Sequence, residues 1–298
     1  MTTTLEFDKA PGAARAYLRA VLGAGKPRVA TVMPALSAIR RKVRIDAGEV
    51  ARCRLLFGLD AEGQVPPTFA HMLAAPLQLA LLTHPSFPVR VLGTVHLSNP
   101  INQQRALRAG EQVDLIVRML ELRQVTRGIE HDMSTEVYDN QGQLVWQGTS
   151  TNFLRQPATA DMRRLTRPAP AEVAPAPDWQ RAWSLALDAG LGRRYARLSG
   201  DWNPIHVSAP SAKLFGFRRA VAHGMWTYGK VLALLEPHLP GDRLSIDIQF
   251  RRPLYLPGRA MVRASVTSDQ DCWHYVVEDL HGTTLHAEGL VMSMPVGI

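Results

Sequence analysis

Two stretches of the chain are apolar at nearly every position and are long enough to form a short helix. They are FAHMLAAPLQLALL, residues 69–82, and VAHGMWTYGKVLALLEP, residues 221–237. A helix that is apolar on all sides has to be enclosed by other elements, because it has no polar face to turn toward water. Both segments start near an Ala-His pair and end in a leucine-rich run. We therefore expect two similar buried helices, one in each half of the chain.

The segments that follow each predicted helix alternate between apolar and polar residues, as strands do. Gly110 precedes EQVDLIVRM, and Gly258 precedes RAMVRASV. Farther along, VYDNQGQLVWQG at 137–148 parallels VEDLHGTTLHAEG at 277–289. Each of these is typical of a strand, a glycine-containing turn and a second strand. The offset between matching segments stays between about 140 and 153 positions, which indicates a duplicated unit.

Each unit is predicted to be α+β, with an antiparallel sheet wrapped around its apolar helix. Joining the two sheets edge to edge would remove an exposed strand edge. Between the units, RQPATADMRRLTRPAPAEVAPAPD has prolines spaced as in an extended linker. We therefore expect an N-terminal domain at 1–154, a linker at 155–178 and a C-terminal domain at 179–298.

The composition narrows the function only slightly. The 298 residues are 46% hydrophobic and 20% charged, as in ordinary globular proteins. The formal net charge of +8 permits an anionic partner but selects none, and the scattered arginines argue against nucleic acid. Cys53 and Cys272 are the only cysteines, and this favours a cytoplasmic protein. The N-terminal residues lack the apolar core of a secretory signal, and the apolar run 72–82 is too short to span a membrane.

The densest group of chemically active residues is SGDWNPIH, residues 199–206. Its glycine and its Asn-Pro pair form turns, so the chain can bend and bring Asp201 close to His206. A carboxylate and an imidazole that face a common point can hold and deprotonate a water molecule. Just downstream, the second apolar helix begins at AHGM, where unpaired N–H groups would bind an oxyanion. A general base beside an oxyanion site suits enolate chemistry next to a carbonyl group.

These residues resemble a known family. The stretch YxxxSGDxNPxH at 195–206, with the following KLFGF and AHGM segments, is similar to the signature of the MaoC-like (R)-specific enoyl-CoA hydratases and 3-hydroxyacyl-thioester dehydratases. Over its whole length the chain resembles the two-domain members of that family. The resemblance implies a double hot dog fold, in which each half is a helix wrapped by an antiparallel sheet. This agrees with the duplicated α+β unit predicted from the pattern.

The resemblance also implies a role for each residue of the motif. Asp201 and His206 would be the catalytic pair that adds water to a trans-2-enoyl thioester or removes it from an (R)-3-hydroxyacyl thioester. Asn203 would orient the pair, and the backbone N–H of Gly224 would polarise the thioester carbonyl. The residues expected to contact the substrate are Gly200, His223, Met225 and Trp226. We expect no metal and no redox cofactor, because the thioester itself acidifies the Cα proton.

The first half departs from the motif. The stretch before its helix is GLDAEGQVPPTFAHM, in which Asp60 has no histidine five residues on and Met72 stands where the second half has Gly224. We therefore expect one active site per chain. The N-terminal half would be a degenerate repeat that supplies a dimer-like partner and part of the acyl tunnel.

Two other functions stay open at this stage. A hot-dog acyl thioesterase would use the same acid to hydrolyse the acyl bond, and it would release a free thiol. A non-enzymatic acyl-binding accessory protein would tolerate the loss of Asp201. The sequence also leaves open the preferred acyl chain length, the choice between coenzyme A and an acyl-carrier protein, and the formation of a homodimer.

Two groups of residues outside the motif contain side chains that can bind a metal ion or a phosphate. The first is a predicted hairpin with nearby residues Cys272, His274, His281 and His286, whose spacing matches no zinc pattern. The second consists of two arginine pairs, 218–219 and 251–252. These pairs fit a solvated face as well as they fit the phosphates of coenzyme A or of a carrier-protein arm.

Overall fold

The computed structural model describes residues 3–22, 32–156, 178–239, 241–267 and 272–294. The first half contains β1 (Thr3–Glu6), α1 (Ala13–Leu22), β2 (Leu36–Arg44), α2 (Ala47–Phe57), α3 (Phe69–Leu82), β3 (Val95–Ser98), β4 (Ile101–Gln103), β5 (Gln112–Val125), β6 (Gly128–Tyr138) and β7 (Leu144–Arg155). The second half contains β8 (Arg181–Leu187), α4 (Leu191–Ser199), α5 (Pro204–Val207), α6 (Ala209–Lys213), β9 (Ala220–Val221), α7 (Gly224–Leu235), the 3₁₀ turn η3 (Glu236–His238), β10 (Leu244–Phe250), β11 (Tyr255–Leu256), β12 (Gly258–Val266), β13 (Cys272–Glu278) and β14 (Leu285–Ser293). Most of the predicted linker, residues 157–177, lies outside the described residues.

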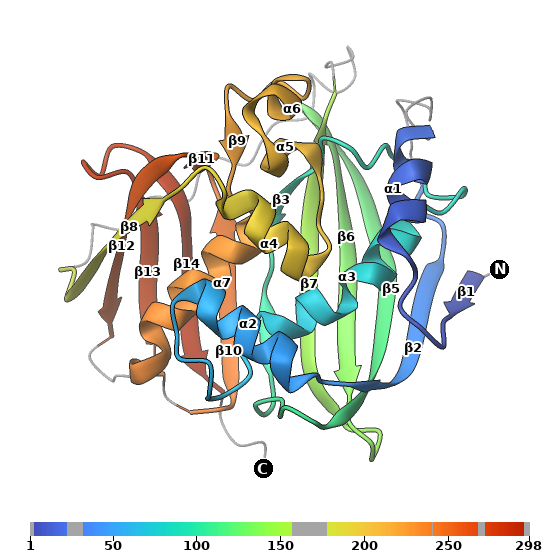
Figure 1. Ribbon diagram of the computed structural model, residues 1–298, viewed down its shortest axis with the longest axis horizontal. Helices are drawn as coiled ribbons and strands as arrows, with labels where there is room; N and C mark the ends of the chain where they lie inside the picture. Colours follow the sequence, from blue (N-terminus) through green and yellow to red (C-terminus); the bar gives the residue numbers. More distant parts are fainter. Residues whose placement is uncertain (1–2, 23–31, 157–177, 240, 268–271, 295–298) are drawn as a thin grey trace.

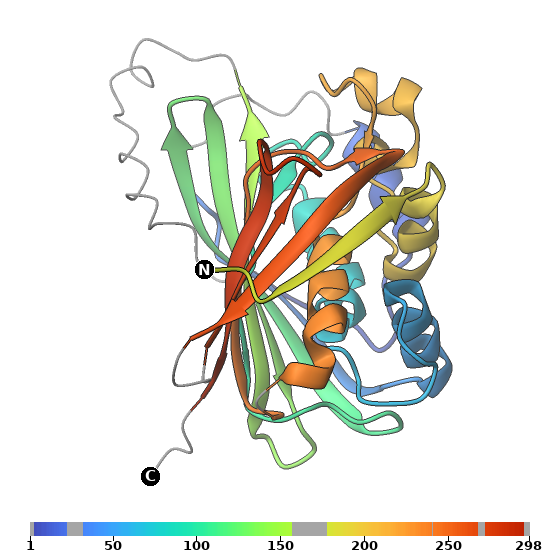
Figure 2. The same cartoon turned by 90° about the vertical axis from the view of Figure 1, so that its left-hand side faces the viewer.

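The two halves share one continuous sheet, as the edge-to-edge prediction required. In the described residues it has twelve strands in the order β1-β2-β5-β6-β7-β3-β10-β14-β13-β12-β8, with β4 pairing to both β7 and β10. The halves meet where β10 pairs antiparallel with β3 and β4. Apart from the parallel pair of β1 and β2, the strand pairs are antiparallel. Figures 1 and 2 show the helices gathered on one face of this bent sheet.

The two predicted apolar helices are α3 and α7, and both pack into the core. The first spans Phe69–Leu82, the bounds expected from the pattern, even though Pro76 lies inside it. The second begins three residues later than the apolar segment that predicted it, at Gly224, because Ala220–Val221 instead pairs with β11 as the short strand β9. No described helix combines the length and the apolar character that a membrane crossing needs.

Contacts between α2 and α7 fix the second apolar helix against the first half. Lys230 on α7 donates a hydrogen bond of 2.6 Å to the carbonyl oxygen of Phe57, at the end of α2. The ring of Phe57 lies so close to Gly229 that a Cβ at Gly229 would come within 2.2 Å of it. The buried guanidinium of Arg54 also reaches Glu236 at 2.7 Å. The N-terminal half therefore positions the helix on which the candidate site is built.

Candidate active site

The SGDWNPIH segment folds as a sharp bend between two helices. Helix α4 ends at Gly200, whose φ of +76° is a left-handed conformation that glycine adopts without strain. The backbone N–H of Asn203 donates to Oδ1 of Asp201 at 3.1 Å, which closes the turn. Pro204 then opens α5, which carries His206. The bend brings Asp201 and His206 together, as the sequence predicted.

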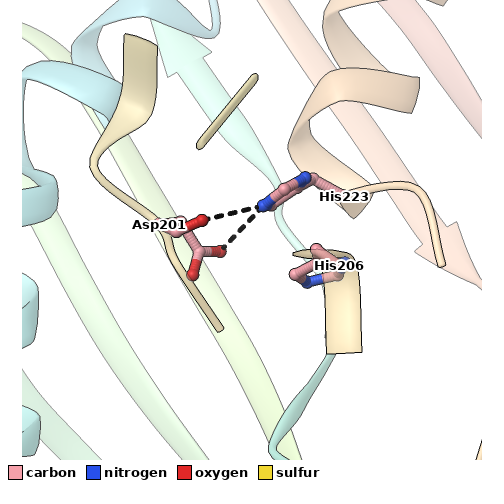
Figure 3. A group of neighbouring side chains, drawn as sticks. All are labelled: Asp201, His206 and His223. Atoms are coloured by element: carbon pink, nitrogen blue, oxygen red, sulfur yellow. Dashed lines mark hydrogen bonds and ion pairs between the residues drawn. The ribbon is translucent and has the colours of Figure 1, made fainter. Parts of the chain in front are cut away.

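The structure adds His223 to this pair (Figure 3). One side-chain atom from each of Asp201, His206 and His223 lies within 4.8 Å of the others. The two imidazole rings are stacked, with their centroids 3.8 Å apart and their planes at 25°. Nε2 of His223 donates to the carbonyl oxygen of Asp201 at 3.0 Å and lies 3.8 Å from its Oδ2 atom. His223 thus holds the backbone of Asp201 and lies beside its carboxylate.

Hydrogen bonding sets which nitrogen of His206 can accept a proton. Nδ1 of His206 lies 2.8 Å from the carbonyl oxygen of Val221, and a carbonyl can only accept, so Nδ1 carries the hydrogen. Burial lowers the pKa of His206 below its usual value, and the ring is therefore neutral near pH 7. A neutral ring with its proton on Nδ1 leaves Nε2 as a free acceptor. This is the state that a general base requires.

Asp201 is ionised in this environment. Burial alone raises the pKa of Asp201, but His223, His206 and two hydrogen bonds outweigh it, and the pKa falls below its ordinary value. The side chain is 45% exposed, and Asp201 lines the cavity described below. Burial lowers the pKa of His223 to about 3, so that ring is neutral as well. The site thus offers one carboxylate and one imidazole nitrogen that can each accept a proton.

Tyr17, from α1 of the N-terminal half, is a member of the site that the sequence analysis missed. Its hydroxyl accepts a hydrogen bond from the backbone N–H of Trp202 at 2.6 Å and donates to Oδ1 of Asp201 at 3.2 Å. Burial raises the pKa of Tyr17 far above its usual value, so the hydroxyl keeps its proton. Tyr17 and Asp201 are 184 positions apart, and no motif or spacing in the sequence links them.

Asn203, which was expected to orient the pair, reaches Asp201 through its backbone N–H. Its side-chain Nδ2 donates to the carbonyl oxygen of Thr94 at 3.1 Å. The Oδ1 atom is buried and has no hydrogen-bond partner within the described part of the chain. Asn203 therefore ties the bend to the N-terminal half and leaves one acceptor free beside the cavity that it lines.

The predicted oxyanion site lies at the start of α7. His223 is the residue before the first helical turn, and its side chain makes no capping bond to the backbone N–H groups there. These N–H groups point along the helix dipole and favour negative charge. A Cβ at Gly224 would lie 2.8 Å from the ring of Phe250, so only glycine lets Phe250 pack against the helix start.

A cavity of about 330 Å³ connects these groups and is lined by both halves of the chain. The predicted residues on its wall are Asp201, His206, Asn203, Gly224, Gly200, His223 and Met225. Trp226, which was expected to contact substrate, is absent from the cavity wall and is buried at 5% exposure in the hydrophobic core. From the first half, α3, β3, β6 and β7 contribute wall residues that the sequence did not single out, among them His71, Leu79, Leu82, His96, His131 and Asn152.

Asp201, His206 and His223 are also the set of described residues with the spacing of metal ligands. The hydrogen bonds leave few donor atoms for an ion. Nε2 of His223 and Nδ1 of His206 both carry a hydrogen that is donated to a carbonyl oxygen. Nδ1 of His223 has no hydrogen-bond partner among the described residues, but the nitrogen that faces Asp201 is Nε2 (Figure 3), which would have to lose its proton to bind an ion. The donor set therefore fits proton transfer better than coordination.

Comparison with known proteins places this site in a family. Residues 184–284 match the family model described as MaoC like domain. The 3-hydroxyacyl-thioester dehydratase X of Mycobacterium tuberculosis is 33% identical over 252 residues, which cover 84% of this chain and 88% of that protein. The crystal structure of HtdX from the same organism superposes with a TM-score of 0.73 at 28% identity, covering 87% of this chain and 100% of that one. Another M. tuberculosis structure, described as a double hotdog fold, gives a TM-score of 0.53 at 14% identity, covering 90% of this chain and 98% of that one.

The shared sheet, the two enclosed helices and these structural neighbours define a protein of the double hot dog class, which confirms the predicted fold. The chain belongs to the MaoC-like family of hydratases and dehydratases that includes 3-hydroxyacyl-thioester dehydratase X. The resemblance noted from the SGDWNPIH motif is thereby confirmed.

Proposed function

We propose that this chain is a hydro-lyase that adds water reversibly to trans-2-enoyl thioesters and gives (R)-3-hydroxyacyl thioesters. One observation carries the proposal. The ionised carboxylate of Asp201 and the unprotonated Nε2 of His206 share a cavity with the uncapped start of α7 at Gly224. A base next to an oxyanion site is what water addition beside a thioester needs. The (R) configuration rests on the family resemblance.

In the proposed reaction the thioester oxygen accepts a hydrogen bond from the backbone N–H of Gly224. Asp201 and Nε2 of His206 hold a water molecule and take one of its protons as its oxygen bonds to Cβ. The Cα=Cβ electron pair moves toward the carbonyl, and the negative charge is stabilised at the start of α7. The enzyme then returns a proton to Cα, so that one water molecule is added in total. The reverse sequence removes water from the hydroxyacyl thioester, and neither direction uses a cofactor.

The neighbouring residues would hold this pair in place. His223 donates to the Asp201 carbonyl and stacks on His206. Tyr17 holds the carboxylate of Asp201 from the opposite half of the chain. Asn203 anchors the bend to Thr94. The pair is thus supported from both halves. Because Asp201 and His206 themselves lie in the second half, we propose that residues 1–154 form a non-catalytic hot dog domain and residues 179–298 a catalytic one.

We infer that the acyl chain extends from the site into the N-terminal half. The cavity continues between α3 and the strands of that half, and its wall includes Leu79, Leu82 and Met133. His71 takes the place in α3 that His223 takes before α7, but no Asp-His pair accompanies it in the sequence. One chain already contains both units, so the proposed site needs no second copy of the protein.

The carrier would bind at the basic mouth of the cavity. Arg251 and Arg252 line the cavity. Arg218 and Arg219 are exposed and lie over the ring of Tyr255, at 4.5 and 5.5 Å from its centroid. We propose that these arginines contact the phosphates of coenzyme A or of a carrier-protein arm, in the cytoplasm. Arg251 also pairs with Glu288 at 2.6 Å, which leaves Arg252 and the 218–219 pair as the stronger candidates.

The experiment that tests the function follows two signals from one reaction. The purified protein is mixed with a short and a medium-chain trans-2-enoyl-CoA, and the enoyl-thioester absorbance and the release of free thiol are recorded together. We expect absorbance to fall without thiol release, and the product to have the (R) configuration at C3. Thiol release would identify a thioesterase instead. Binding of the thioesters with no reaction, even when they are attached to an acyl-carrier protein, would identify an accessory protein.

A further inference from the structure

The wall of the cavity in the N-terminal half carries several polar side chains among its apolar ones. Histidines from three different elements face it: His71 on α3, His96 on β3 and His131 on β6. Ser150 and Asn152 on β7 line the same region. Burying polar groups against an alkyl chain costs free energy, because their hydrogen bonds to water are lost and not replaced. A polar atom on the ligand would avoid this cost by forming the missing hydrogen bonds.

The hydrogen bonds of His71 and the burial of His131 define what two of these histidines can offer. Nε2 of Gln78 lies 3.4 Å from Nδ1 of His71 and 3.0 Å from Oγ1 of Thr135, so the amide donates to both. His71 is then left with its hydrogen on Nε2, as a donor. His131 is only 1% exposed, and its Nδ1 has no hydrogen-bond partner among the described residues. This part of the wall therefore contains a hydrogen-bond donor, Nε2 of His71, and a buried nitrogen without a partner, Nδ1 of His131.

The three histidines carry no charge. Burial lowers the pKa of His71 to about 3 and the pKa values of His96 and His131 to about 4. The rings of His71 and His96 are stacked, with their centroids 5.8 Å apart. Each neutral imidazole has one donor and one acceptor nitrogen. Such a wall suits an uncharged oxygen, as in a hydroxyl or carbonyl group, better than a carboxylate.

One polar position of this wall has an apolar counterpart in the other half of the chain. In the internal repeat Gly148 corresponds to Gly289, so Ser150 corresponds to Val291. Ser150 lies on the cavity wall, while Val291 is fully buried in the hydrophobic core. The fold therefore accepts an apolar residue at this position, and the N-terminal half carries a polar one. The Ser150 hydroxyl donates to Oδ1 of Asn99 at 2.7 Å, so the groups left for a ligand are those of the neighbouring wall residues.

We propose that the N-terminal part of the cavity binds a hydroxyl or carbonyl oxygen carried by the acyl chain. The substrate would then be an enoyl thioester with an oxygen substituent on its chain, beyond the double bond. His71, His131 and Asn152 would be the residues that select it. This inference rests on the proposed hydratase function and on the placement of the acyl chain in the N-terminal half.

The test compares substrates that differ only in one oxygen. kcat/KM is measured for trans-2-octenoyl-CoA and for its ω-hydroxy and ω-oxo derivatives, and for the matching hexenoyl series. We expect the best oxygenated substrate of a series to exceed the plain one by about 10-fold, the contribution of one hydrogen bond that is otherwise unmade. His131→Leu and Asn152→Leu should each remove this preference. Leu79→Met, on the apolar part of the same wall, should retain it.

The preference is the ratio of kcat/KM for the oxygenated substrate to kcat/KM for the plain one, measured with the same protein. A general loss of activity or of folded protein lowers both values equally and leaves the ratio unchanged. A ratio at or below one in the wild-type protein for both series overturns the proposal. A ratio that survives both leucine variants also overturns it. Calorimetric binding of octanoyl-CoA and ω-hydroxyoctanoyl-CoA to the Asp201→Asn protein gives the same comparison without turnover. An oxygen preference in binding with no hydration by the wild-type protein would therefore reject the proposed function and support the polar subsite.

Discussion

The contact between Tyr17 and Asp201 gives a prediction that the motif alone could not. Tyr17→Phe removes the hydroxyl that donates to Oδ1 of Asp201 at 3.2 Å and accepts from the N–H of Trp202 at 2.6 Å. The benzyl part of the side chain remains, so the packing of α1 is kept. What is lost is the link between α1 and the bend that carries Asp201.

The size of the effect follows from these two bonds. A hydrogen bond to a charged group contributes about 1.5–3 kcal/mol, and one between neutral groups about 1 kcal/mol. Asp201 is partly exposed at 45% and Trp202 is exposed, so water replaces part of both contacts. We expect about 1–2 kcal/mol to be lost from transition-state binding, which is a fall in kcat/KM of roughly 5- to 30-fold.

The pH profile separates this effect from a general loss of structure. The Tyr17 hydroxyl lowers the pKa of Asp201, so its removal raises that pKa. Asp201 acts as an anion, and activity is lost as the pH falls through its pKa. A raised pKa therefore moves the acid limb of the kcat/KM profile to higher pH in Tyr17→Phe. Tyr138→Phe on β6 is the control, because the Tyr138 hydroxyl donates to Glu136 outside the cavity.

The assay is enoyl-CoA hydration by wild type, Tyr17→Phe and Tyr138→Phe across the pH range where all three are folded. Wild-type rates with an unshifted acid limb in Tyr17→Phe would refute the reasoning. An equal loss of rate in both variants with no shift would assign the effect to stability instead.

Two further predictions concern other parts of the structure. Gly224→Ala should lower kcat by about 10-fold or more with a small change in KM. The added Cβ would meet the Phe250 ring at 2.8 Å and disturb the helix start that binds the developing oxyanion. Steady-state kinetics measures this effect, and an unchanged kcat would contradict it. Arg54→Ala should lower the free energy of unfolding by about 3 kcal/mol. The substitution leaves the carbonyl groups of Asp60 and Gln64 and the carboxylate of Glu236 without their buried partner. Denaturant unfolding measures this loss, and a value below about 1 kcal/mol would show that the halves are held together elsewhere.

The elements that repeat locally were predictable from the sequence. Helix α3 coincides with the apolar segment 69–82, because a helix enclosed on all sides must be apolar throughout. The shared sheet followed from the duplicated alternation and from the need to cover a strand edge. Asp201 and His206 were found because one turn brings them together within six consecutive residues.

The parts that depend on packing between distant segments were not predictable. Tyr17, Thr94 and His71 line the cavity from the other half of the chain. No sequence pattern indicates which residues so far apart will come into contact. The contact between the Asn203 side chain and Thr94 could not be predicted, because the two residues are 109 positions apart. Trp226 was expected to contact substrate, but the packing of α7 leaves it off the cavity wall and in the core, and no sequence pattern indicated this.

The most direct test of the mechanism is hydration of a trans-2-enoyl-CoA by wild type, Asp201→Asn and His206→Gln, with thermal unfolding recorded for all three. The account predicts that each variant is slower by about 10²–10⁴-fold, because each loses a group that accepts the proton from water. It also predicts that the unfolding temperature of Asp201→Asn stays close to that of the wild type, since the Asp201 side chain is 45% exposed. Wild-type turnover in either variant would contradict the assignment of the pair.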